Sequence, residues 1–248
     1  METWREKTLR WGFFALVVGA IEVVVRLNLV DRIFLTSPSL IAVAAWERLL
    51  SGDLIGLLMT TVYETAIAFS IAVIVGLPAG FLLWQYPLFG RAYDELLGAL
   101  FASPLILLYP IFLVIFGRGI SAVIAMGCIS GIIPIVLNTH QALRDVNQTY
   151  IKVGKSMRLT NGQTITYILF PAAWPIIMGG LKLGLTYTLI SIIALEFLVE
   201  IGGIGTLASK GYYWFNTEEL YLGVVGAIFL SMIFIYLLGK AESRLFSS

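Results

Sequence analysis

The chain has 248 residues, of which 59% are hydrophobic and only 12% are charged, and its mean hydropathy is +0.92. Soluble domains carry about 25% charged residues, so this composition excludes an ordinary soluble fold and indicates a polytopic membrane protein. A net charge of +1 excludes the clustered basic surface that nucleic-acid binding requires. A single cysteine, Cys128, and a single histidine, His140, exclude a disulfide framework and predict no metal site.

The N-terminal segment METWREKTLRWGFF has the charged-then-apolar order of a signal peptide. Glu22 and Arg26 interrupt the region in which a small-residue cleavage site would follow, so we predict a retained first span. These two residues are four positions apart on a predicted helix, which predicts an ion pair between them.

Six stretches approach the roughly 20 apolar residues that a spanning helix needs. They cover about residues 11–30, 61–84, 96–117, 119–139, 174–200 and 220–239. The third and fourth are separated only by Gly117, Arg118 and Gly119, which predicts a tight turn. We therefore expect an all-α protein with about six transmembrane helices, an N-terminal part at 1–60 and a core of five spans at 61–248.

A short amphipathic segment, LTSPSLIAVAAWERLLSGDL, follows the first span. Ser37 is suited to cap a helix and Pro38 to occupy its first turn. We expect this helix to lie at the outer membrane interface.

The distribution of basic residues predicts the orientation, because cationic loops favour the cytoplasm. An even number of spans places both termini on one side. With that side cytoplasmic, eleven of the sixteen Lys and Arg residues lie inside, so we predict that both termini are cytoplasmic.

The polar segment from Lys152 to Pro171, KVGKSMRLTNGQTITYILFP, lies within a connection that we place at residues 140–173. We predict a helix over about 149–159, a turn at Asn161–Gly162, and a rigid start of the fifth span at Pro171 and Pro175. The cations alone favour an ordinary cytoplasmic loop over a specialised segment.

The spacing of this segment resembles the cytoplasmic signature of the permease subunits of type I ABC importers, in the branch serving nitrate, sulfonates, taurine and bicarbonate. That signature is Glu-Ala-Ala, three residues, Gly, nine residues, Ile-x-Leu-Pro. Aligned on Ile168 and Pro171, the family's Glu falls on Lys152 and its Gly on Arg158. Other stretches that resemble the family are FLTSPS from Phe34, GLPAGFLLW from Gly76, SPLILLYPIFLVIFGRG from Ser103, IPIVLNTHQALRDV from Ile133 and EFLVEIGGIGTL from Glu196.

The resemblance implies a coupling helix in the 149–162 loop that docks on a separate ATPase. The residues it places there are Lys152, Val153, Gly154, Lys155, Met157, Arg158, Leu159, Gly162, Ile168 and Pro171. Since the family's Glu and Gly are absent, this chain either docks on a partner with complementary acids or is the divergent half of a heterodimer.

The resemblance also implies that the third and fifth spans line a translocation path. Candidate residues there are Ser103, Pro104, Tyr109, Pro110, Thr186, Thr188, Ser191 and Glu196. The hydroxyls could instead bond within their own helices, and Glu196 could brace the outer end of its span. The glycines Gly179, Gly180 and Gly184 are expected to permit close helix packing.

The family resemblance implies a multi-pass permease in the inner membrane of a prokaryotic cell. Its implied partners are a second permease copy (identical or related), two ATP-binding subunits, a substrate-binding protein and membrane lipid. The chain carries no Walker G-x-x-x-x-G-K-[ST] segment, so we expect ATP and Mg to bind to the partner and no enzyme activity here. A transporter or channel that works without an ATPase is the alternative, and a membrane enzyme is a weaker one.

Overall fold

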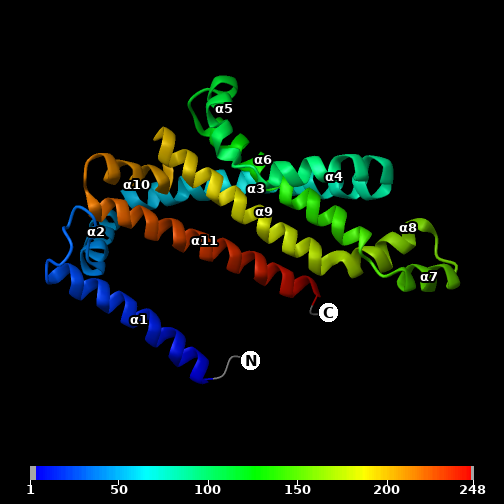
Figure 1. Cartoon of the computed structure of the whole chain (residues 1–248), viewed down its shortest axis with the longest axis horizontal. Coiled ribbons are helices and arrows are strands. Elements are labelled where there is room, and N and C mark those ends of the chain that lie inside the picture. Colours follow the sequence, from blue (N-terminus) through cyan, green and yellow to red (C-terminus); the bar gives the residue numbers. More distant parts are fainter. Residues whose placement is uncertain (1–3, 247–248) are drawn as a thin grey trace. The chain divides into compact units, whose positions relative to one another are not determined.

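The computed structural model describes residues 4–246, and this part of the chain is helical, without strands (Figure 1). In chain order its elements are α1 (Trp4–Arg26), α2 (Pro38–Leu50), α3 (Asp53–Gln85), α4 (Pro87–Ala102), η1 (Leu105–Leu108), α5 (Tyr109–Phe116), α6 (Ile120–Arg144), α7 (Gln148–Ser156), α8 (Asn161–Thr164), the π-helix η2 (Ile165–Leu169), α9 (Phe170–Val199), α10 (Gly203–Tyr213) and α11 (Thr217–Phe246).

Five helical segments in the described part are long and apolar enough to cross a membrane, and a sixth candidate is a bent pair. The five are Trp4–Arg26, Asp53–Gln85, Ile120–Arg144, Asn161–Val199 and Thr217–Arg244. This agrees with the prediction of about six spans.

The bent pair corrects the prediction of one continuous third span over 96–117. Helix α4 and the segment Leu105–Phe116 meet at an angle of 87°. The proline ring disfavours helical backbone at the residue before it, and Ser103, which precedes Pro104, accordingly has an extended ψ of 144°. The tight turn predicted at Gly117–Gly119 is present between α5 and α6.

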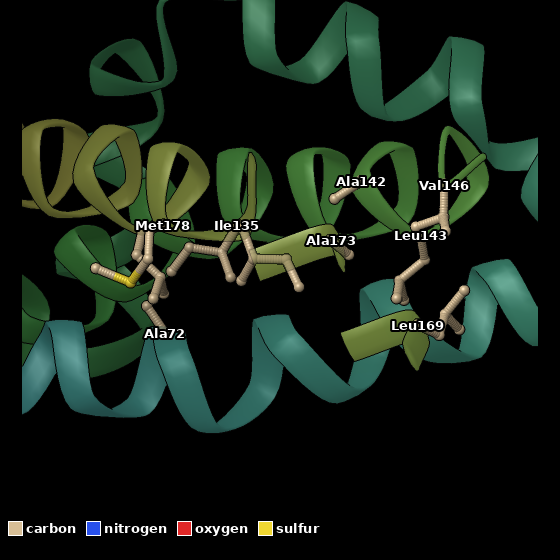
Figure 2. Packing of buried hydrophobic residues seen from close by; sticks show 10 residues of the cluster. Ala72, Ile135, Ala142, Leu143, Val146, Leu169, Ala173 and Met178 are labelled. Carbon is tan, nitrogen blue, oxygen red and sulfur yellow. The ribbon is translucent and has the colours of Figure 1, made fainter. Parts of the chain in front are cut away.

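The chain forms two compact units, one made of Met1–Thr61 with Glu196–Phe229 and one made of Val62–Leu195 with Leu230–Ser248. The second unit contains a core of ten buried apolar residues, including Ala72, Ile135, Leu143, Leu169 and Met178. Figure 2 shows these side chains packed between α3, α6 and α9. Helix α6 is thus the central element of this unit.

Glycines set the close approach of α9 to α6. A Cβ on Gly184 would lie 2.6 Å from Ile135 Cγ1, and one on Gly180 would lie 2.4 Å from Asn138 Cβ. Small residues allow such contacts between membrane helices, so the packing role predicted for these two glycines is confirmed. The prediction is wrong for Gly179, since a Cβ there would have no atom within 4 Å.

In the first unit α1 is tied to α2 by a carboxylate. Glu22 forms the predicted ion pair with Arg26 at 2.6 Å and also accepts hydrogen bonds from the backbone N and the hydroxyl of Ser39. Helix α2 begins at Pro38 as predicted, but Ser37 makes no side-chain cap. Its hydroxyl lies 3.0 Å from that of Ser39 instead.

Candidate functional site

The connection between α6 and α9 contains α7, a nine-residue helix with both ends fixed by hydrogen bonds. The side chain of Asn147 accepts from the backbone N of Thr149 at 2.9 Å, which caps the N-terminus. At the other end the N–H of Arg158 bonds to Lys155 O at 3.0 Å, and the N–H of Leu159 bonds to Gly154 O at 3.1 Å. This pair of bonds is a Schellman motif, which gives the helix a defined end.

The position of this end corrects the predicted helix over 149–159 and the predicted turn at Asn161–Gly162. Helix α7 stops at Ser156 because Arg158 takes the left-handed conformation, with φ of +57°. Asn161 and Gly162 begin the next helix rather than forming the turn. The family's signature glycine aligns with Arg158, the residue whose backbone conformation favours glycine.

A capping box joins this turn to the next helical segment. Thr160 Oγ1 accepts from the backbone N of Gln163, and the Gln163 side chain accepts from the backbone N of Thr160. From there the chain stays helical over Asn161–Val199. The fifth span therefore has no new start at Pro171, which lies inside this continuous segment.

The π-helix η2 precedes Pro171 within that segment. The N–H of Phe170 bonds to Ile165 O, the wide i to i−5 pattern. A proline ring lacks an N–H and crowds the preceding turn, so the wider turn accommodates Pro171. The loop thus passes into α9 without a flexible linker.

Helix α7 packs back onto η2 through Gly154. This residue is buried, and a Cβ on it would lie 2.7 Å from Ile168 Cδ1 and 3.5 Å from Thr164 Oγ1. The fold therefore brings together the two ends of the motif that the sequence singled out. Figure 1 shows α7 and α8 side by side at one end of α6 and α9.

The remaining surface of α7 has two distinct flanks. Tyr150, Val153 and Met157 are 55%, 49% and 67% exposed, and their spacing places them on one stripe of a 3.6-residue helix. Lys152 and Lys155 are exposed on the opposite flank. The helix thus presents an apolar stripe and a cationic edge to whatever lies outside the chain.

The ten predicted coupling residues occupy one continuous stretch of structure. Residues 152–155 lie in α7, Met157, Arg158 and Leu159 in its C-terminal turn, Gly162 in α8, Ile168 in η2 and Pro171 in the first turn of α9. No contact with a partner tests their role, so the assignment stays a prediction.

Three of the predicted path residues share a small cavity in the second unit. Ser103, Pro104 and Ser191 line it, together with Tyr187 and Ser130, and its volume is about 130 Å³. The hydroxyls of Ser191 and Ser130 lie 2.7 Å apart, and the Ser103 hydroxyl donates to Ala99 O at 2.9 Å.

The other predicted path residues do not line that cavity. Thr186 donates to Lys182 O within its own helix at 2.9 Å, the alternative foreseen for these hydroxyls. Thr188 is buried and donates to Gly127 O of α6 at 3.2 Å. Tyr109 and Pro110 form the first turn of α5. Their role in a path remains a prediction.

Glu196 lies in the first unit and holds the N-terminus of α10. Its Oε2 accepts from the backbone N of Gly205 at 2.8 Å, and its Oε1 accepts from Thr61 Oγ1 at 2.6 Å. Thr61 Oγ1 also accepts from the backbone N of Ile204 at 2.9 Å. A carboxylate is favourable at a helix N-terminus, and this arrangement is a structural brace.

The sequence missed one polar cluster. His140 Nδ1 lies 3.1 Å from Asp94 Oδ1, and Arg144 Nη1 donates to Asp94 Oδ2 at 3.0 Å. The i, i+4 spacing of His140 and Arg144 signalled a shared helix face, but nothing in the sequence indicated that α4 would supply their acid.

The family model for binding-protein-dependent transport system inner membrane components matches residues 72–241. The chain belongs to this family. It therefore functions as an importer permease, a multi-pass component of the inner membrane.

Individual relatives match over most of the chain. The putative aliphatic sulfonates transport permease SsuC of Bacillus subtilis is 24% identical over 85% of this chain and 76% of its own length. The nitrate import permease NrtB of Synechocystis is 31% identical over 66% of this chain and 62% of its own length. An inward-facing structure of the MetNI methionine ABC transporter contains a chain with a TM-score of 0.64 and 21% identity, over 79% of this chain and 95% of that one. This last likeness supports the helical fold.

Proposed function

We propose that this chain forms the translocation path for a small solute and that α7 couples it to a separate ATPase. The observation that carries the proposal is the construction of the α6–α9 connection. Helix α7 is exposed, capped at both ends, packed on η2 through Gly154, and joined to a span by unbroken helix. A flexible loop in this place would not transmit a displacement of α7 to α9, whereas this rigid connection would.

The coupling follows from this geometry. A partner that displaces α7 pushes on η2 through the Gly154–Ile168 contact, and η2 continues directly into α9. The displacement therefore reaches the span that carries Thr188 and Ser191, whose hydroxyls bond to α6. The partner binds ATP and Mg and hydrolyses the ATP, and this chain supplies the lever.

The surface of α7 indicates the complementary partner surface. An apolar stripe at Tyr150, Val153 and Met157 fits an apolar cleft, and Lys152 and Lys155 on the other flank fit an acidic rim. The lysine at position 152, where the family has Glu, then reflects a partner with matching acids.

We infer the assembly and the solute from the relatives. Permeases of this family are expected to pair with a second copy, two ATPase subunits and a binding protein. The names of four relatives specify aliphatic sulfonates, nitrate, bicarbonate and taurine, which are small and carry an anionic group, and another relative is named for glycine betaine, carnitine and choline. We propose a small solute, with anions as the first class to test.

The test uses the α7 stripe. Val153→Asp places a charge where an apolar cleft is expected, and we expect ATPase co-purification and ATP-driven uptake to fall on the order of ten-fold or more. Ser243→Asp adds the same charge at an exposed position of α11 and should change neither. Uptake that persists with no ATPase bound would instead identify a transporter or channel that works without one.

A further inference from the structure

A second cavity in the second unit lies beside the first turn of α7 and has a volume of about 390 Å³. This is within the range of about 300–1,000 Å³ that small-ligand pockets occupy. Its polar lining comes from Arg91 of α4, His140 and Arg144 of α6, and Gln148 of α7, and Trp84 of α3 also lines it. Pro87, Leu143 and Ile151 supply an apolar part of the lining, so four elements meet around one amphipathic space.

The lining contains two guanidinium groups and no carboxylate. Arg144 forms ion pairs with Asp94 at 3.0 Å and with Asp145 at 3.8 Å, two acids outside the lining, and Asp94 also contacts His140. Arg91 donates to its own helix, from Nε to Pro87 O at 3.3 Å, and has no acidic partner among residues 4–246. Arg91 is therefore the guanidinium of the lining whose charge is not offset by a paired acid, and it favours an anion in the cavity.

Aromatic side chains lie in the lining of this cavity and in the segment that follows Trp84. Trp84 lines it, and the next two turns carry the exposed rings of Tyr86, Phe89 and Tyr93. The ring centroids of Tyr86 and Phe89 lie 6.5 Å apart, and those of Phe89 and Tyr93 lie 6.4 Å apart. Trp and Tyr side chains, here Trp84, Tyr86 and Tyr93, gather at the level of the lipid head groups. The cavity therefore has the aromatic neighbours that a position at the level of the lipid phosphates requires.

We propose that this cavity binds the phosphate head group of an anionic phospholipid. Arg91 and Arg144 supply charge-assisted hydrogen bonds to the phosphate oxygens, and Gln148 adds an amide donor. Basic pockets between membrane helices bind anionic head groups by this chemistry.

The bound head group would connect α4 and α6 to the first turn of α7, because Gln148 and Ile151 of α7 belong to the same lining. Occupancy of the cavity is therefore linked to the position of α7. Lipid binding needs only this chain, so a test of the lipid site gives a result that does not depend on whether α7 couples to an ATPase.

The test measures lipid binding to the full chain purified in a neutral detergent. Native mass spectrometry compares adducts of phosphatidylglycerol with those of phosphatidylcholine carrying the same acyl chains. We expect the wild-type protein to favour phosphatidylglycerol, and Arg91→Gln to weaken that binding about five-fold, the effect of one cation near a lipid phosphate. Arg118→Gln, at the far end of α6, removes an equal charge and should leave binding unchanged.

The outcomes separate the sources of the phosphate. In one outcome, millimolar inorganic phosphate displaces phosphatidylglycerol from the wild-type protein but not from Arg91→Gln. This would show that the cavity binds a free anion, and it would overturn the assignment to a lipid. Equal binding of the two lipids, or equal losses in Arg91→Gln and Arg118→Gln, would overturn the site. An unchanged melting temperature of Arg91→Gln in phosphatidylcholine shows that the variant is folded, and Gln148→Ala gives a second, uncharged test of the lining.

Discussion

Arg158 has a backbone conformation that side chains rarely adopt, and the end of α7 depends on it. Its φ of +57° is stabilised by the two Schellman hydrogen bonds from its own N–H and from that of Leu159. Left-handed backbone costs an L-residue about 1–2 kcal/mol. The protein tolerates this cost at the position where its relatives' signature has glycine, and it thereby gains a cation beside α7.

Arg158→Gly should raise the free energy of unfolding by about 1 kcal/mol, because glycine adopts the left-handed conformation without the clash of a Cβ. Unfolding is followed by loss of helical circular dichroism in neutral detergent. Arg158→Ala removes the same charge and retains the Cβ, so it should not give this gain. A glycine variant no more stable than the alanine variant would contradict the role of the backbone.

Thr61 is the second residue whose contacts determine a local structure. Its hydroxyl donates to Glu196 Oε1 and accepts from the N–H of Ile204, and all of these groups are buried. Thr61→Val keeps the shape of the side chain but removes these two bonds, together with a longer one of 3.4 Å to Leu57 O within its own helix. We expect a loss of about 1–3 kcal/mol in unfolding free energy, the cost of leaving buried polar groups unpaired.

The neighbouring residue provides the control for Thr61. Thr60 Oγ1 donates to Gly56 O within its own helix, so Thr60→Val should change the same measurement by less than about 0.5 kcal/mol. Equal effects of the two substitutions would show that Thr61 does not brace α10.

At the scale of the elements, long apolar runs predicted the spans well, since about 20 consecutive apolar residues are the length that a membrane-spanning helix needs. The failures lie where short-range chemistry decides. The break at Ser103–Pro104 and the π-turn of η2 each had a signal in a proline, Pro104 and Pro171, whereas the left-handed Arg158 had none in residue type. The motif drew attention to the connection that contains α7, whose coupling role stays a prediction, and the contact of Gly154 with Ile168 depends on how α7 folds back.

The packing of α9 on α6 is testable with two glycines of one helix. Gly184→Ala places a Cβ 2.6 Å from Ile135 Cγ1 and 3.0 Å from Gly131 O, so α9 must move. We expect a loss of about 1–3 kcal/mol in unfolding free energy from overpacking. Gly179→Ala meets open space and should gain about 0.5–1 kcal/mol from helix propensity. The opposite order would indicate that Gly184 is not a packing contact.

At the scale of the whole molecule, the bent pair of α4 with Leu105–Phe116 decides the topology. Four spans precede α7 if the pair crosses the membrane and three if it does not. Only the first case places the N-terminal end of α1 on the same side as α7. The distribution of basic residues favours this case, because it puts eleven of the sixteen cations on the cytoplasmic side.

Cysteine labelling with a membrane-impermeant reagent in intact cells distinguishes the two cases. The only native thiol, Cys128, is buried, and Cys128→Ala provides the background for single cysteines. We expect Arg118→Cys to be labelled from outside, and Thr8→Cys and Lys155→Cys to be protected until the cells are opened. If Thr8→Cys is labelled while Lys155→Cys stays protected, an odd number of spans lies between them. The break at Ser103–Pro104 would then mark a re-entrant segment, in which α4 enters the membrane and Leu105–Phe116 returns to the side on which α3 ends.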